Sequence, residues 1–161
     1  MKKTVCTPRL LLGLLGGIFC ASLPVYAVEV GFKGQLVESI PCEVNSGDLI
    51  KVDFDHVIIR GIDGNQYRKP VPYNITCSGL GSVRLSVQGT AISFDDAAVV
   101  TDKSGLGIRV EQNGIPMRLN QPIPVDLANP PALTVVPVAD PASLPVAGAF
   151  VALATLLADY Q

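Results

Sequence analysis

His56 is the sequence's only histidine, and it lies in the stretch VDFDHVIIR, close to Asp53 and Asp55. An imidazole beside carboxylates can act as a general base or as a metal ligand. In a strand, however, successive side chains point to opposite faces, so Asp53 and Asp55 would point away from His56. We therefore interpret His56 as a solvent-facing or edge residue.

The remaining polar groups also fail to form a catalytic set. Asp95 and Asp96 are adjacent, and adjacent side chains diverge in an extended chain, so we interpret the pair as part of a loop. The stretch GLGSVRLSVQG contains glycines but lacks the lysine and the helix start of a phosphate site. We therefore expect a protein that is not an enzyme and that binds no cofactor and no metal.

The first 27 residues are typical of a secretory signal peptide. Basic residues precede an apolar run, and small residues follow it: Lys2, Lys3 and Arg9, then Leu10 to Phe19, then Val25 and Ala27. Cleavage after Ala27 would leave 134 residues beginning at Val28, which is enough for one domain. The alternative, a membrane anchor, is disfavoured because the apolar run is short for a bilayer span.

The predicted mature chain is acidic and contains one pair of cysteines. It keeps nine Lys and Arg against fourteen Asp and Glu, a net charge of −5, so nucleic acid is a poor partner. The two cysteines of the mature chain are Cys42 and Cys77. An even pair in an exported chain predicts one disulfide. Closing a loop of this size would stabilise the folded protein by about 4 kcal/mol in the chain-entropy model.

Short runs rich in Val, Ile and Leu alternate with Gly, Pro, Asn and Asp along the mature chain. This pattern predicts an all-β sandwich or barrel. We expect strands near residues 28–37, 49–59, 73–77, 82–87, 106–111, 115–119 and 132–138, and at the carboxyl end. Asn113 and Gly114 predict a tight turn between two strands, because both residues tolerate positive φ. A second candidate turn surrounds Gly64.

The sequence ends on GAFVALATLLADYQ, residues 148–161. The thirteen residues from Val146 to Ala158 carry no charge. This run is shorter than the roughly 20 residues that a membrane helix needs. In a strand, alternate residues would share one face: Phe150, Ala152, Ala154, Leu156, Ala158 and Tyr160. Ala and Leu are also good helix formers, so the local pattern leaves strand and helix open.

Two features of the amino-terminal half resemble pilin subunits of the chaperone–usher pathway of Gram-negative bacteria. The stretch VGFKGQL places Val30, Phe32, Gly34 and Leu36 on one face, with glycine at the small position of that family's donor segment. The resemblance implies that Val28 belongs to the same donor strand. The stretches IPCEVN and YNITC resemble the regions around the two family cysteines. In brevity and amino-terminal pattern the chain is similar to minor adaptor subunits of P-pilus tips.

The carboxyl end carries the most specific part of this resemblance. Gly148 is fourteenth from the last residue, Tyr160 is penultimate, and alternating apolar residues lie between them. This arrangement is similar to the assembly signature of chaperone–usher pilins. The resemblance extends over essentially the whole chain after the predicted signal peptide.

The resemblance implies an incomplete immunoglobulin-like β-sandwich that lacks its final strand. It divides the chain into a signal peptide at residues 1–27, a donor segment at 28–41 and a pilin domain at 42–161. An apolar groove is expected beside residues 148–160. A periplasmic chaperone would lend a strand to this groove first, and the donor segment of a neighbouring subunit would then replace it.

We therefore expect a structural subunit, a minor pilin or adaptor, that contributes to cell adhesion. It would pass through the periplasm and an outer-membrane usher to the cell-surface fimbrium. The alternative is an adhesive module of the pilus tip in which surface loops bind a ligand. A secreted β-sandwich enzyme would require a polar constellation that the sequence does not contain.

Overall fold

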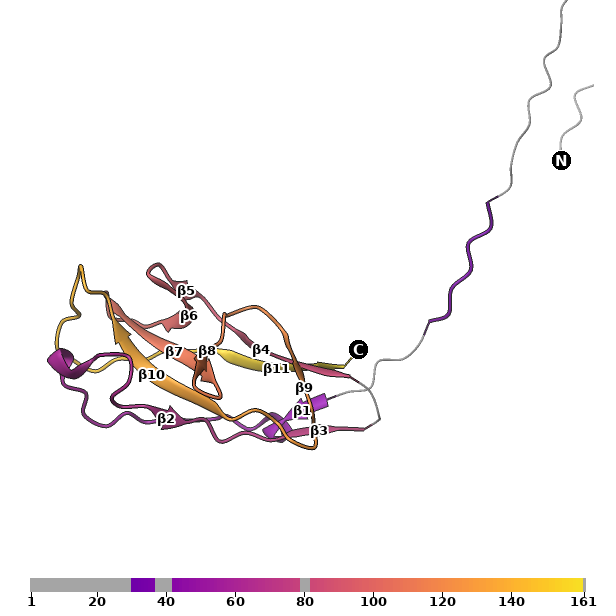
Figure 1. Ribbon diagram of the computed structural model, residues 1–161, viewed down its shortest axis with the longest axis horizontal. Coiled ribbons are helices and arrows are strands. Elements are labelled where there is room, and N and C mark those ends of the chain that lie inside the picture. Colours follow the sequence, from indigo (N-terminus) through magenta and orange to yellow (C-terminus); the bar gives the residue numbers. More distant parts are fainter. Residues whose placement is uncertain (1–29, 37–41, 79–81, 161) are drawn as a thin grey trace, which may run out of the picture. The chain divides into compact units, whose positions relative to one another are not determined.

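The computed structural model describes residues 30–36, 42–78 and 82–160 (Figure 1). The predicted signal peptide and Val28 lie outside these residues. The chain divides into two units, Met1–Leu36 and Val37–Gln161. In the first unit, residues 30–36 form no regular element. The second unit contains all the strands and helices of the described residues.

The second unit is all-β, with two short 3-10 helices. The strands are β1 (Cys42–Val44), β2 (Lys69–Pro70), β3 (Ile75–Cys77), β4 (Val83–Gln88), β5 (Ala91–Ile92), β6 (Asp95–Val100), β7 (Leu106–Gln112), β8 (Ile115–Pro116), β9 (Ile123–Val125), β10 (Leu133–Ala139) and β11 (Thr155–Tyr160). The helices are η1 (Asn45–Gly47) and η2 (Ile59–Gly61). Within the described residues, no helix is long and apolar enough to span a membrane.

The strands pair antiparallel in three sheets (Figure 1). The largest has the order β2-β10-β7-β6-β5, with β8 also paired to β7. A second sheet has the order β11-β4-β9, and β1 pairs with β3. In the second sheet β11 is an edge strand, paired with β4 from Thr155 opposite Gln88 to Tyr160 opposite Val83.

The core lies between the two larger sheets and follows the period-two alternation of their strands. Val83, Leu85 and Val87 of β4 are at most 5% exposed and share one face. Val110 of β7 and Leu133 of β10 belong to the same buried cluster. Burying a side chain of this size stabilises the fold by about 1.5–3 kcal/mol.

Several sequence predictions are confirmed. Strands form near residues 73–77, 82–87, 106–111 and 132–138. Asn113 and Gly114, with φ of 50° and 80°, make the tight turn between β7 and β8. Gly64, with φ of 76°, lies in the second predicted turn.

Three predictions about local structure are wrong. The strand expected near residues 28–37 does not form within residues 30–36, its described part. Asp95 and Asp96 do not belong to a loop, because they begin β6 and each pairs with an arginine, Arg109 and Arg118 respectively. Residues 49–59 form no strand up to η2. Their alternation is suitable for a strand, but a strand must exchange backbone hydrogen bonds with a neighbouring strand. Within the described residues, no strand lies beside this segment in that way.

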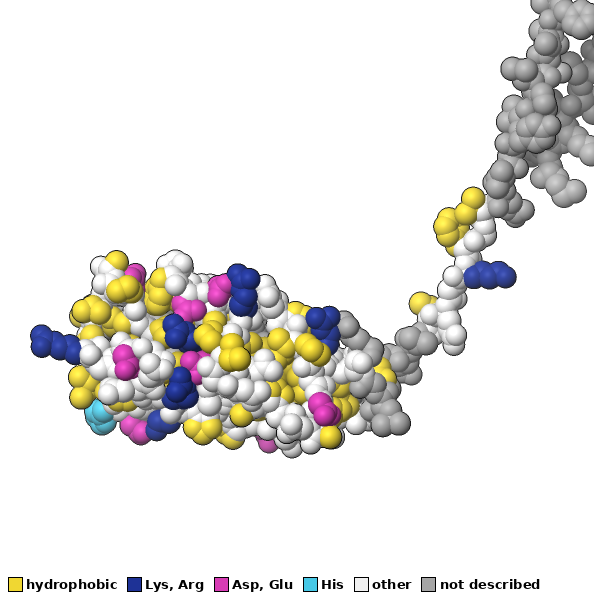
Figure 2. Space-filling view, viewed as in Figure 1, with side chains coloured by type: hydrophobic (Ala, Val, Ile, Leu, Met, Phe, Trp, Pro, Cys, Tyr) yellow, Lys and Arg dark blue, Asp and Glu magenta, His cyan; other side chains and the backbone are white. Residues whose placement is uncertain are grey.

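The surface carries charges of both signs among hydrophobic side chains. Figure 2 shows this mixture on one face of the molecule, where basic and acidic side chains are interspersed. Such a mixed face provides no continuous basic surface for a phosphate backbone, in keeping with the acidic net charge.

Candidate binding groove

An open groove of about 1590 Å³ lies between two segments that we name the first flank, residues 47–60, and the second flank, residues 145–156. Its floor is the apolar core of the sandwich: Val44, Val71, Val87, Val99, Leu106, Ile108, Val110, Leu133 and Val135. The two flanks are far apart in the sequence. The groove is therefore a product of the complete fold.

The first flank presents alternate apolar side chains to the groove. Ile50, Val52 and Phe54 are half-buried, whereas the residues between them are exposed. The alternation is interrupted at Asp55, whose φ of 53° turns the chain. The N–H of Asp55 donates to the Asp53 carboxylate at 2.8 Å. After this turn Val57 and Ile59 are the half-buried residues.

His56 is exposed on the first flank, as are Asp53 and Asp55. This exposure confirms the interpretation of His56 as a solvent-facing residue. Within the described residues, no group of three His, Cys, Asp or Glu side chains could hold a metal ion.

The second flank also alternates. Phe150, Ala152 and Leu156 are half-buried, whereas Val151 and Leu153 are 60% and 81% exposed. Of the other predicted site residues, Ala158 is buried in the core and Tyr160 packs against it, while Gly148 and Ala154 line the groove but are exposed. The predicted strand is thus shorter than expected, because only its second half pairs as β11.

The backbone of the second flank is oriented by the chain segment that follows β6. The N–H of Val151 donates to the Asp102 carboxylate at 2.8 Å, and the N–H of Asp102 donates to the Val151 carbonyl at 3.1 Å. Thr101 and Ala152 form an isolated antiparallel bridge. Because successive residues of a strand direct their backbone bonds to opposite sides, the backbone groups of Phe150 and Ala152 face the groove.

Gly148 occupies a position that favours glycine. Its φ is 147°, and a Cβ at this residue would lie 3.3 Å from the Lys103 Nζ. A side chain here would therefore meet both backbone strain and a close neighbour.

The flanks contact each other at one level of the groove. The rings of Phe54 and Phe150 have their centroids 6.0 Å apart and are tilted by 39°. This separation is within the usual range for interacting aromatic side chains. The groove is thus narrowed at this level.

A disulfide joins Cys42 to Cys77, as the sequence predicts. The two residues are directly opposite in the β1–β3 pair. Because β1 leads directly into η1 and the first flank begins at Gly47, the last residue of η1, the disulfide fixes the start of that flank to the domain.

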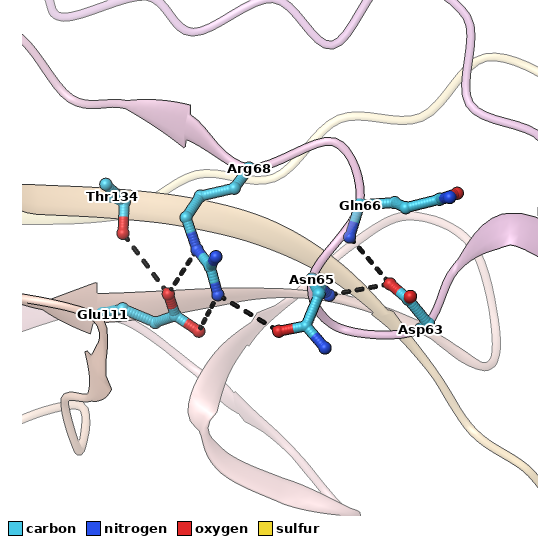
Figure 3. Close-up of polar contacts among 6 residues, drawn as sticks. All are labelled: Asp63, Asn65, Gln66, Arg68, Glu111 and Thr134. Atoms are coloured by element: carbon cyan, nitrogen blue, oxygen red, sulfur yellow. Dashed lines mark hydrogen bonds and ion pairs between the residues drawn. The ribbon is translucent and has the colours of Figure 1, made fainter.

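An ion pair that the sequence analysis did not identify fixes the chain after the first flank (Figure 3). Glu111 of β7 is 3% exposed, and Arg68 donates to its carboxylate from Nε at 2.8 Å and from Nη2 at 3.3 Å. Thr134 Oγ1 lies 3.4 Å from the same carboxylate. The hydrogen bond to Glu111, together with its charge, raises the pKa of Arg68. A glutamate within a buried strand was the available signal for such a pair.

The segment before Arg68 is a turn organised by Asp63 (Figure 3). The Asp63 carboxylate accepts the backbone N–H groups of Gln66 at 2.7 Å and Asn65 at 2.8 Å. These two hydrogen bonds, first that of Gln66, lower the pKa of Asp63. Arg68 Nη2 also contacts the Asn65 side-chain oxygen at 3.4 Å, which links the turn to the ion pair.

The predicted donor residues of the first unit are exposed. Val30 and Phe32 are 67% and 91% exposed, and Leu36 is exposed as well. A Cβ at Gly34 would have no heavy atom within 4 Å. Within residues 30–36, the described part of the first unit, these residues present an apolar edge that no element covers.

Comparison with known proteins identifies relatives over most of the chain. The chain is 36% identical over 141 residues to the fimbrial-like protein YfcQ of Escherichia coli (strain K12), covering 83% of this chain and 87% of the relative. It is 29% identical over 128 residues to YfcR of the same organism, covering 75% and 74%.

The fold is similar to that of solved pilus subunits. The P pilus adaptor subunit PapF matches with a TM-score of 0.55 and 22% identity, over 77% of this chain and 98% of PapF. The P pilus rod subunit PapA matches with a TM-score of 0.58 and 21% identity, over 83% of this chain and 100% of PapA. These similarities support the expected incomplete immunoglobulin-like sandwich.

A family model described as "Fimbrial protein" matches residues 30–161. The match includes residues 30–41 of the predicted donor segment, the disulfide and both flanks of the groove. The chain therefore belongs to the fimbrial protein family and is a structural protein rather than an enzyme.

Proposed function

We propose that this protein is a minor pilin or adaptor subunit of a chaperone–usher pilus, that it polymerises by donor-strand exchange, and that it contributes to cell adhesion. The observation that carries the proposal is the groove, in which two extended flanks border an apolar floor and the described residues place no strand between them. Leaving about 400 Å² of apolar surface in water would cost on the order of 10 kcal/mol. An added strand would cover this surface and satisfy the open edges.

The short connection between the proposed donor segment and the domain supports a donor strand from another molecule. Only residues 37–41 separate Leu36 from Cys42. If the segment folded back as a hairpin, with Leu36 opposite Cys42, Val30 would reach only the level of Asp48. The groove extends from there to Arg60. In such a hairpin the chain's own segment would stop near the start of its own groove and leave most of it uncovered.

The sizes of the side chains support a register for the incoming strand. In an antiparallel arrangement, large donor residues lie beside small residues of the second flank and the one glycine lies beside the large one: Val30 with Ala154, Phe32 with Ala152, Gly34 with Phe150, and Leu36 with Gly148. Val28 then lies beside Leu156, still within the groove. A parallel strand would place Val28 beyond Pro145, where the groove ends.

In this proposal residues 28–41 donate to a neighbour, and the domain of residues 42–161 receives. A periplasmic chaperone occupies the groove until an outer-membrane usher brings the neighbouring subunit. Family membership supports this route from the periplasm to the cell surface, because fimbrial proteins are components of surface fibres.

The proposal is tested by adding the missing strand covalently. A copy of residues 28–37 is attached after Gln161 through a short turn, giving a chain that we name the strand-fused chain. We expect it to be a stable monomer without a chaperone, whereas the unfused mature chain is recovered only in complex with one. An unfused chain that folds alone as a stable monomer would contradict the proposal.

A further inference from the structure

Tyr67 is placed unusually for an aromatic residue. Its φ is 64°, a left-handed backbone conformation that residues with side chains seldom adopt. Its hydroxyl oxygen accepts a hydrogen bond from the backbone N–H of Ile58 at 3.2 Å. Ile58 precedes η2, and its carbonyl accepts the N–H of Gly61 at 2.8 Å. Both backbone groups of Ile58 thus have partners within the domain.

The turn of η2 packs against the Tyr67 side chain. A Cβ at Gly61 would lie 3.1 Å from the Tyr67 hydroxyl oxygen and 2.9 Å from Gln66 Oε1. Glycine at position 61 therefore permits the close approach that brings the hydroxyl to Ile58.

Three consecutive residues connect the first flank to the large sheet. Tyr67 binds the flank at Ile58, and Arg68 binds the buried carboxylate of Glu111 on β7. Lys69 contacts the Asp55 carboxylate at 3.2 Å and is also paired with β10 opposite Val135. Each attachment to the flank is thus adjacent in sequence to an attachment to the sheet. A strained backbone conformation persists where surrounding contacts hold it in place. The contacts of Arg68 and Lys69 hold the backbone of Tyr67 in this way.

These contacts occupy the flank from Asp55 onward. The N–H of Asp55 already donates to Asp53, and that of Ile58 to Tyr67. Residues 48–54 precede both interruptions and retain the alternation that is suitable for strand pairing.

We infer that Tyr67, held in place by the Arg68–Glu111 ion pair, positions the first flank for strand pairing and ends its pairing edge before Ile58. The disulfide fixes the other end of the same flank. A flank held at both ends loses less conformational entropy when a strand enters, so uptake is favoured. This inference rests on the proposed function of the groove.

The test measures amide hydrogen exchange in the strand-fused chain. Tyr67→Phe removes the hydroxyl and keeps the ring. We expect amides of the appended strand and of residues 48–54 to exchange about tenfold faster, while amides of β7 and β10 keep their rates. A role limited to general stability would change both groups together. Glu111→Gln should act in the same direction as Tyr67→Phe, because it weakens the anchor of Arg68.

The matched control is Arg118→Ala. It removes a different arginine–carboxylate pair, Arg118 with Asp96, which contacts neither the turn before Arg68 nor the first flank. It should leave exchange of the appended strand unchanged. Equal acceleration of all strands by Tyr67→Phe, or of none, would overturn the inference while the proposed function stands. If the appended strand of the unsubstituted chain exchanges as fast as an unstructured peptide, strand uptake fails, and the inference fails with it.

Discussion

Phe54 and Phe150 lie on opposite flanks of the groove with their ring centroids 6.0 Å apart. No side chain fits between rings at this separation. The lining on either side of Phe150 is small, with Gly148 in one direction and Ala152 in the other. A strand that enters the groove must therefore present a residue without a side chain at this level. Gly34 meets this requirement among the four described alternating positions of the proposed donor segment.

Replacing Gly34 in the appended copy of the strand-fused chain with leucine should lower the free energy of unfolding by about 1–3 kcal/mol, the usual cost of overpacking. In a Phe54→Ala background the same replacement should cost less, because the ring that it meets is absent. Urea unfolding of the four chains measures this coupling.

Gly31→Leu in the appended copy is the control for that cycle, since residue 31 lies on the other face of the strand. Its effect should be the same in both backgrounds. Equal costs of Gly34→Leu with and without the Phe54 ring would show that the glycine lies at a different level.

The two ends of the chain should fail at different steps of assembly. In the proposed assembly, Phe32→Asp would place a charge without a partner in the neighbour's apolar groove, so pairing with the neighbouring subunit should be lost while chaperone binding survives. Ala154→Asp should abolish the chaperone complex, because this residue lines the groove. Co-purification with the chaperone followed by subunit pairing measures both steps. The opposite pattern would reverse the roles assigned to the two ends.

Cys77→Ser should lower the free energy of unfolding by about 2–5 kcal/mol and reduce periplasmic yield. The loss follows from the position of the disulfide, which joins β1 to β3 at the start of the first flank. Thiol titration of the denatured unsubstituted protein provides the check. Two reactive thiols would contradict the disulfide.

Acid should weaken the turn that precedes Arg68. The N–H groups of Gln66 and Asn65 hold the pKa of Asp63 below its ordinary value of 3.8. The folded pKa is thus below the unfolded one, so this carboxylate stabilises the fold fully above the unfolded value, and that contribution is lost as pH falls from the unfolded value through the lower folded pKa.

Asp63→Asn separates this contribution from that of the other carboxylates, because asparagine keeps the acceptor oxygen but does not titrate. Urea midpoints of the strand-fused chain should fall more steeply for aspartate than for asparagine between about pH 5 and pH 3. Parallel curves for the two proteins would show that Asp63 does not contribute.

Periodicity and turn chemistry predicted the fold class, most of the longer strands and the turn at Asn113. These features depend on neighbours in sequence, such as the alternation of Val83, Leu85 and Val87. Asp95 and Asp96 were misassigned because their environment depends on Arg109 and Arg118, which are distant in the sequence. Local pattern could not reveal partners that only the folded sheet brings near.

Only part of the groove was predicted, because its two flanks are distant in the sequence and local pattern shows each flank alone. The sequence indicated the second flank through its alternation and Gly148, and the donor segment through its resemblance to pilins. The first flank was predicted as an ordinary strand, because alternation at Ile50, Val52 and Phe54 cannot show whether a neighbouring strand is present. The attachment of Ile58 to Tyr67 was missed, since it requires an uncommon backbone conformation at Tyr67.

The pairing of β11 with β4, from Thr155 opposite Gln88 to Tyr160 opposite Val83, also determines when the domain can finish folding. Contacts between segments so distant in sequence form slowly, because loop closure precedes any gain from the contact. During synthesis, β4 is completed well before β11, the strand that pairs with its edge. Folding speed is thus limited by chain topology, and a helper that holds the carboxyl-terminal segment in an extended conformation would shorten the interval in which exposed chains can aggregate.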